Sequence, residues 1–288
     1  SPLMVPDQDA PLRPGMPQAG SVSGLPTSTV AVVRSHNRRG AVAEALALLD
    51  AELQPILTGP AVILVHLNRR RADPAPMSSL LDVILSAVPG EVVIASGVPH
   101  AHTIFERSGY HRECWGRPVR FVDVSQDEEH WRSVERPGVG SIRIAQTLAS
   151  AGCRIALTPL ESLRGRSGIP AWRRAMLEAI HPDDRSRFDG VPIRRAWPDL
   201  SIIEGPLNRF GREVVAIVGI DPTAVDAVAA EMLGGRRSCG DAMVVQAPRL
   251  VLVGDPITAP VKPTWQSPRT LARGLRRDAG HGDSKGAF

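Results

Sequence analysis

The chain has 288 residues, of which 43% are hydrophobic, and a formal net charge of +4 at pH 7. This length can bury one sizeable core. No window approaches 18 uninterrupted apolar residues, which excludes a membrane-spanning helix, and we find no apolar region of a signal peptide. The cysteines Cys114, Cys153 and Cys239 are too widely separated for a disulfide framework or a ferredoxin motif, so we expect a reducing, cytoplasmic compartment.

The positive charge does not indicate a nucleic-acid partner. The basic residues are scattered along the chain. All of them except Lys262 and Lys285 are arginines, which a coding bias toward arginine would also explain. A basic motif interleaved with aromatic residues is missing. We therefore expect neither a nucleic-acid nor a membrane partner, and the sequence leaves homo-oligomerisation open.

The two ends of the chain differ in composition from its middle. Residues 1–28 are rich in proline, and residues 259–288 are rich in Gly, Arg, Asp and Ser, so we expect both to be flexible or peripheral tails. No repeat of fixed period appears in residues 29–258. The sequence therefore predicts a single domain over residues 29–258.

Within that domain, short runs rich in β-branched residues alternate with longer helical patterns. The expected strands are residues 29–33, 61–65, 91–95, 119–124, 153–158, 200–203 and 214–218. The expected helices are residues 41–53, 77–88, 141–151, 171–180 and 222–233. This alternation predicts an α/β, Rossmann-like fold with a mostly parallel sheet and helices on both faces.

The clearest local signal is the strand-turn-helix of residues 214–235. The apolar run 214–218 is typical of a strand buried on both faces of a parallel sheet. Asp221 and Pro222 then form a good N-cap and first helical position. Ligands of open α/β sheets bind beyond the carboxyl ends of the strands. We therefore expect this turn to lie at the ligand-binding edge of the sheet.

Polar residues follow several predicted strands, and we expect them to meet at that edge. They are His66, Asn68, His100, Glu204 and Asp221. We predict that His66, His100 and Glu204 are catalytic, and that Asn68 and Asp221 bind substrate. Two plainer interpretations stay open. Polar residues are common at strand ends without any functional role, and a role as helix N-cap alone would explain Asp221.

His100 and His102 flank one alanine just beyond the strand 91–95. Such a pair can transfer a proton near neutral pH or bind a metal ion. A zinc site usually needs three or four protein ligands, and no third ligand stands at a recognisable spacing. We therefore predict no metal site and assign His102 to substrate binding, although the pair is also compatible with an ordinary loop.

Two further segments carry groups that suit an anion. Arg164 and Arg166 lie in a glycine-containing loop just before the helix 171–180, where arginine side chains and backbone N–H groups could bind a phosphate or carboxylate. Asn208 follows the strand 200–203 and could extend the same pocket. Equally, both segments could be plain turns.

Two segments resemble a known family. Residues 197–205 read WPDLSIIEG and residues 219–230 read GIDPTAVDAVAA. Together they resemble the strand and helix motifs of domain of unknown function family 362, over roughly residues 29–254. Residues 63–68, ILVHLN, and 95–100, ASGVPH, match two more of its segments less closely. The family is similar in outline to the nickel-dependent lactate racemase superfamily, which implies a Rossmann-like architecture.

The chain departs from that family's pattern at several positions. His66 stands where the family usually has lysine, Glu204 where it has aspartate, and residues 160–163, LESL, replace its LKTH loop. The ferredoxin-type cysteine cluster of some members is absent. These departures leave open whether the chain acts on a different substrate or has lost catalysis.

Two hypotheses about function follow. The first is a cytosolic enzyme that acts on a small anionic carboxylate or phosphate by acid–base chemistry, as an isomerase, a lyase or a transferase. The second is a non-catalytic binding or interaction protein that keeps the family fold. The cofactor is unknown. No GxGxxG follows the first strand with an acidic residue about twenty positions on, so a nicotinamide cofactor is not indicated.

Overall fold

The computed structural model describes residues 27–67, 73–126, 131–136, 140–163, 170–188, 193, 196–207, 212–233 and 249–257. The two predicted tails lie outside these residues, apart from residues 27 and 28, which belong to the first strand. Among the described helices, none combines the length and the apolar character needed to cross a membrane.

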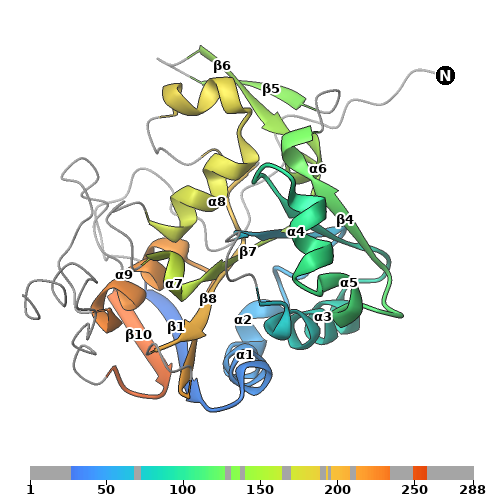
Figure 1. Cartoon of the computed structure of the whole chain (residues 1–288). Helices are drawn as coiled ribbons and strands as arrows, with labels where there is room; N and C mark the ends of the chain where they lie inside the picture. The colour runs from blue at the N-terminus through green and yellow to red at the C-terminus, as the bar shows by residue number, and fades with distance from the viewer. Residues whose placement is uncertain are drawn as a thin grey trace, which may run out of the picture.

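An eight-stranded sheet forms the centre of the molecule (Figure 1), in the spatial order β10-β1-β9-β8-β7-β2-β3-β4. Its strands are β1 (Thr27–Ser35), β2 (Ala61–Val65), β3 (Val92–Ser96), β4 (Val119–Asp123), β7 (Cys153–Pro159), β8 (Leu200–Pro206), β9 (Val214–Gly219) and β10 (Arg249–Gly254). All seven predicted strands are present. A separate antiparallel ribbon joins β5 (Trp131–Arg136) to β6 (Gly140–Ala145).

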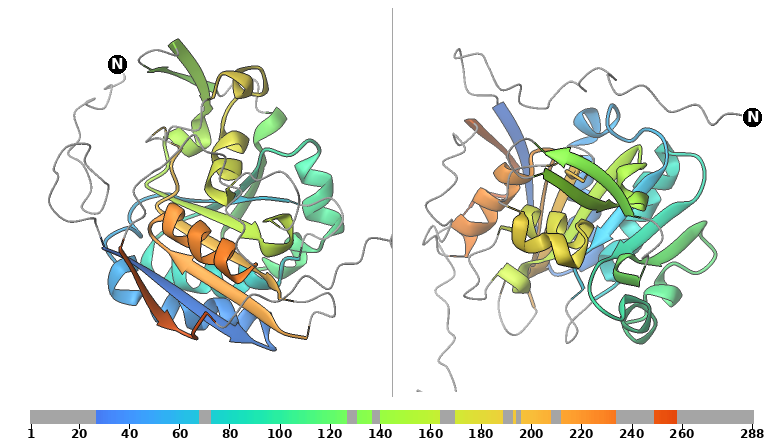
Figure 2. Two further views of the ribbon diagram at one scale, coloured as in Figure 1. Left: turned by 90° about the vertical axis from the view of Figure 1, so that its left-hand side faces the viewer. Right: turned by 90° about the horizontal axis from the view of Figure 1, so that it is seen from above.

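Helices cover both faces of the sheet (Figure 2), which confirms the predicted α/β class. One face packs against α1 (Arg38–Ala47), α2 (Asp50–Leu53), α3 (Ala75–Ala87), α4 (Ala101–Arg107) and α5 (Tyr110–Glu113). The other face packs against α6 (Gln146–Ala149), α7 (Leu160–Leu163), α8 (Ala171–Ala179), α9 (Pro222–Met232) and the ribbon. The 3₁₀ helices are η1 (Val124–Gln126) and η2 (Pro182–Arg187).

The central strands are buried on both faces, as their sequences predict. Within β2, Ile63 and Val65 belong to the core that packs on α1 and α3, whereas Val62 and Leu64 belong to the core that packs on α8. Successive side chains of a strand point to opposite faces, so a nearly all-apolar run is what two covered faces require. The same alternation tells which face a residue at a strand end occupies.

The sheet is mostly parallel, but β9 runs antiparallel to both of its neighbours, β1 and β8. Gly219 at the end of β9 pairs with Ser201 at the start of β8, and Val214 pairs with Pro206. The turn after β9 therefore lies at the edge opposite the carboxyl end of β8. The prediction that Asp221 shares an edge with Glu204 is wrong, because an apolar run indicates burial but not strand direction.

The expected helix at residues 141–151 is only partly present. Residues 140–145 form β6, and the helix is restricted to α6. In β6, Ile142 and Ile144 are fully buried and alternate with more exposed neighbours, which is the period of a strand. Over so few residues the apolar spacing of this segment fits the period of a helix as well as that of a strand, and the length of the segment does not distinguish the two.

Candidate functional site

The structure describes five of the nine sequence-predicted site residues, four at one edge of the sheet and one at the opposite edge. His66 follows β2, His100 and His102 lie at the start of α4 just beyond β3, and Glu204 lies near the end of β8. These strands are parallel, so all four residues are at one edge of the sheet. Asp221 is at the opposite edge. Asn68, Arg164, Arg166 and Asn208 fall outside the described residues.

His66 is paired with Glu178, a residue of α8 that the sequence did not single out. The imidazole Nδ1 is in hydrogen-bond contact with Glu178 Oε1. The other oxygen of Glu178 accepts hydrogen bonds from the Ser96 hydroxyl, at 3.3 Å, and from the Gly97 N–H, at 3.1 Å. Because an ionised carboxylate can only accept hydrogen bonds, we assign the proton between the pair to Nδ1 of His66.

This arrangement fixes the orientation of the imidazole and leaves its second nitrogen for chemistry. The side chain of Glu178 is only 8% exposed, whereas that of His66 is 21% exposed. A buried carboxylate on Nδ1 holds one tautomer, so Nε2 carries the lone pair that accepts a proton. The same carboxylate stabilises the imidazolium that forms after the transfer. The arrangement is therefore compatible with general acid–base chemistry.

The end of β3 can approach α8 this closely only because residue 97 is glycine. A Cβ at Gly97 would lie 2.4 Å from the carbonyl oxygen of Glu178, which is a backbone atom and cannot rotate away. The close approach lets the Gly97 N–H reach the carboxylate of Glu178. Thus the glycine of the SGVPH segment contributes to the site through its missing side chain.

The amino end of α8 is also anchored. Asp226 on α9 accepts hydrogen bonds from the N–H groups of Ala171 and Trp172, at 3.1 and 3.3 Å, and so satisfies donors that a helix start leaves open. Burial raises the pKa of Asp226 to about 7, although these hydrogen bonds and the charge of Arg174 oppose the rise. Asp226 thereby ties α9 to the helix that carries Glu178.

Glu204 belongs to a different cluster, on the opposite face of the sheet. Arg38 at the start of α1 binds both carboxylate oxygens, with Nε on Oε2 and Nη2 on Oε1 at 2.7 Å, and reaches Asp73 through Nη1 at 2.5 Å. Burial raises the pKa of Glu204 to about 7, whereas the hydrogen bonds and charge of Arg38 lower it. The pair connects β8 to α1 and leaves little of Glu204 for a substrate.

The edge therefore carries two clusters rather than the single site that the sequence suggested. Glu178 approaches His66 from α8, while Arg38 approaches Glu204 from α1, and these helices cover opposite faces. Sequence reasoning missed Glu178 because it lies within the amphipathic pattern of α8. It missed Arg38 because a charged residue at a helix start is usual on a surface.

His100 and His102 are exposed at the start of α4. His100 adopts a left-handed conformation, with φ of 65°, and is the only non-glycine residue in the described part of the chain with positive φ. Its side chain does not cap the helix; instead, the Ala101 N–H donates to Asp123 Oδ2 at 2.9 Å. Left-handed residues other than glycine are uncommon and often mark functional sites.

Asp221 is used fully by the local structure. Its Oδ1 accepts hydrogen bonds from the N–H and the hydroxyl of Thr223, at 2.9 and 2.6 Å, and its Oδ2 accepts one from the Ser28 hydroxyl at 2.8 Å. These contacts are those of a helix N-cap, the plainer of the two interpretations of Asp221.

No metal site is evident in the part of the chain that the structure describes. Among those residues, no group of three or more His, Cys, Asp or Glu side chains could hold a metal ion.

Comparisons with known proteins add a likeness of fold. Neither a family model nor a curated protein matches the chain. Among solved structures, the chain is similar to the lactate racemase apoprotein from Thermoanaerobacterium thermosaccharolyticum, with 12% sequence identity and a TM-score of 0.44. The match covers 74% of this chain and 57% of that one, so the chain spans little more than half the length of the racemase.

Proposed function

We propose that this protein is an enzyme that moves a proton on a small anionic metabolite, with Nε2 of His66 as the general acid–base atom. The contact between His66 and the buried carboxylate of Glu178 is the observation that carries this proposal. Glu178 is a positioning residue, because it acts through His66. Many isomerase and lyase reactions begin with such a proton transfer, and a transferase can use the same group to activate its nucleophile.

The other predicted residues take different places in this proposal. His100 is exposed just beyond Gly97 and is the candidate for a second acid or base. Glu204 is assigned to the ion pair with Arg38, since both of its oxygens are bound. We further propose that the chain is a divergent member of domain of unknown function family 362, because of the motifs described above, and that it acts in the cytoplasm, because of its cysteine usage.

Exchange with solvent deuterium tests the proposal even while the product is unidentified. The protein is incubated in D₂O with a panel of small carboxylic and phosphorylated acids, and deuterium gained by each acid is followed by mass spectrometry. We expect one acid to exchange, and His66→Gln to slow that exchange by about 10²–10⁴-fold. His111→Gln is the matched control, because His111 packs on Phe121 away from the Glu178 contact.

Two outcomes would count against an enzyme. If no acid of the panel exchanges while one of them binds, the non-catalytic alternative is favoured. If an acid exchanges equally fast with His66→Gln and with the unaltered chain, His66 is not the proton carrier.

A further inference from the structure

Arg185 on η2 is a half-buried arginine whose guanidinium is held by backbone carbonyl groups. Its Nε donates to the carbonyl of Ile180 at 3.1 Å, and its Nη2 reaches the carbonyl of Gly97 at 3.5 Å, the outer limit of a hydrogen bond. No ion pair of Arg185 occurs in the part of the chain that the structure describes. Burial lowers the pKa of Arg185, and the charge of Glu178 opposes that change.

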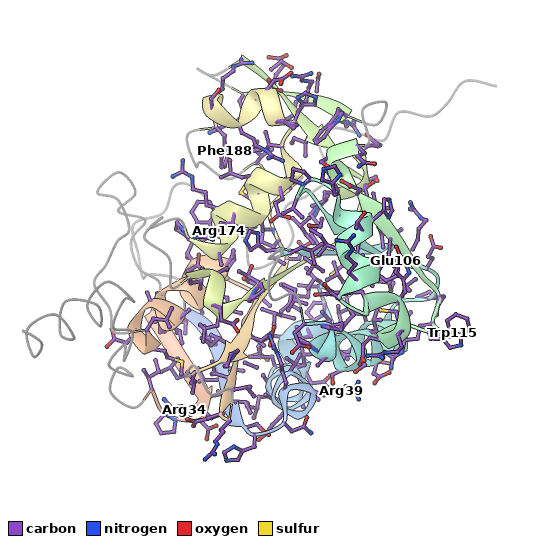
Figure 3. All side chains as sticks on the ribbon, in the orientation of Figure 1. Arg34, Arg39, Glu106, Trp115, Arg174 and Phe188 are labelled. Carbon is purple, nitrogen blue, oxygen red and sulfur yellow. The ribbon has the colours of Figure 1, made fainter. Side chains whose placement is uncertain are left out.

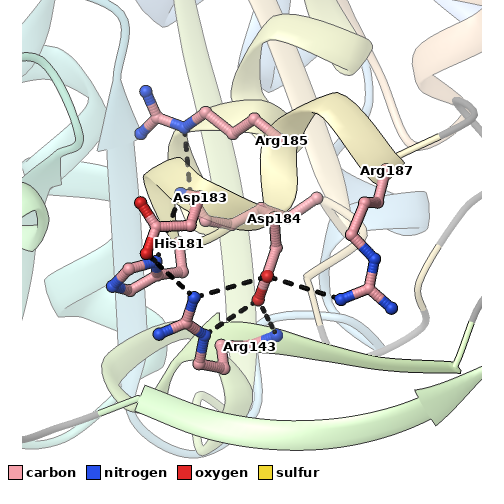
Figure 4. A network of polar contacts seen from close by, with 7 residues as sticks. Arg143, His181, Asp183, Asp184, Arg185 and Arg187 are labelled. Carbon is pink, nitrogen blue, oxygen red and sulfur yellow. Dashed lines mark hydrogen bonds and ion pairs between the residues drawn. The ribbon is translucent and has the colours of Figure 1, made fainter.

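The carboxylates nearest to Arg185 in sequence are bound elsewhere. Asp184 Oδ2 accepts from both the backbone N–H and the Nε of Arg143, each at 2.9 Å, and its Oδ1 is 3.6 Å from Arg187. Asp183 also pairs with Arg143, at 3.2 Å. In Figure 4, the guanidinium of Arg185 points away from this network. The network thus fixes η2 against β6 and turns Arg185 to the other side.

On that side a single residue, Gly97, lies between Arg185 and the proton-transfer pair. The N–H of Gly97 donates to Glu178 Oε2, and the carbonyl of the same residue accepts from Arg185. Arg174 on α8 (Figure 3) is also near enough to Glu178 to interact with its charge. A guanidinium that is held by two carbonyls keeps its positive charge and further donors for an anion.

The chemistry of the surroundings favours a carboxylate. A single planar guanidinium offers two parallel N–H donors, which match the two oxygens of a carboxylate. The carboxylate of Glu178 nearby repels a phosphate dianion more strongly than a carboxylate, which carries a single negative charge. We propose that Arg185 is the anion-binding residue of the His66 site and holds the carboxylate of a small organic acid. This inference rests on the function proposed above.

Binding of acetate tests the inference separately from catalysis. Sodium acetate is titrated at constant ionic strength into the ¹⁵N-labelled protein, with the Gly97 amide and the Arg185 Nε–H as reporters. We expect saturable shifts of both signals and an increase of the dissociation constant by about tenfold or more in Arg185→Gln. Arg187→Gln, two residues along η2, should bind acetate like the unaltered protein. Circular dichroism checks that both variants are folded.

The remaining outcomes separate the two proposals. Acetate binding that persists in His66→Gln, the variant in which we expect slowed exchange, would support an anion site that is distinct from the proton carrier. Equal acetate binding by Arg185→Gln and the unaltered chain would overturn the inference and leave the role of His66 untouched. Inorganic phosphate that binds more tightly than acetate would overturn the assignment to carboxylates.

Discussion

Replacing Arg38 with methionine should lower the free energy of unfolding by about 3–5 kcal/mol at pH 8, the cost of leaving a buried charge without its partner. The carboxylate of Glu204 is 3% exposed and receives two hydrogen bonds from Arg38. Asp73 also loses a partner, but its side chain is 40% exposed and can be hydrated. Urea unfolding followed by circular dichroism measures the loss.

The neighbouring residue provides the control for this prediction. Arg39 on the same helix (Figure 3) pairs with Glu113, but its side chain is 57% exposed, so Arg39→Met should cost less than about 1 kcal/mol. The double variant Arg38→Met with Glu204→Leu should recover most of the stability, because it leaves no charge behind. An Arg38→Met variant that is as stable as Arg39→Met would show that the buried pair is not what joins β8 to α1.

Stability should fall as the pH rises from about 4 to 8. The pKa values of Asp226 and Glu204 are raised to about 7 by burial, so between their unfolded values and 7 the folded chain binds more protons than the unfolded chain. Their contribution is complete below about pH 4 and is lost as the pH passes 7. Because one pKa unit corresponds to about 1.4 kcal/mol, we expect a loss of up to about 8 kcal/mol from these groups together.

Asp184 acts in the opposite sense at lower pH. The hydrogen bond from Arg143 lowers the pKa of Asp184. Its contribution to the free energy of unfolding is therefore present above the pKa of the unfolded chain and is lost as the pH falls through the pKa of the folded chain.

Unfolding in urea at a series of pH values measures how the free energy of unfolding depends on pH. Asp226→Asn should flatten the decline between pH 5 and 8, whereas Glu106→Gln on the exposed face of α4 should not. Stability that rises with pH over that range would contradict the assignment of buried, raised-pKa carboxyl groups.

The fold could be predicted largely from local patterns. The strand β2 is a run of β-branched and other apolar residues without a polar position, as two covered faces require, and β3 and β7 are mostly apolar runs that add only Ser96, Arg154 and Thr158. The direction of β9 could not be predicted in this way, because it depends on pairing with β1 and β8 rather than on its own residues. β10 was also missed, although its residues 250–253, LVLV, form the same kind of short apolar run; three of them are partly exposed.

The candidate site was only partly predictable. The position of His66, His100 and Glu204 at one edge could be predicted, because polar residues that follow buried parallel strands gather there. Their partners Glu178 and Arg38 come from helices, and the sequence does not tell which helical residue will turn toward the edge. Arg185 was missed for the same reason, since its orientation depends on the contacts of η2 with β6.

The most direct test of the central claim is the tautomer of His66, read from long-range ¹H–¹⁵N correlations at pH 8. His66→Gln identifies the signals. We predict that the neutral ring carries its proton on Nδ1, donated to Glu178, and that Glu178→Gln alters this distribution while the protein stays folded. A neutral ring protonated on Nε2, with the same distribution between the two nitrogens in Glu178→Gln as in the unaltered chain, would contradict the account.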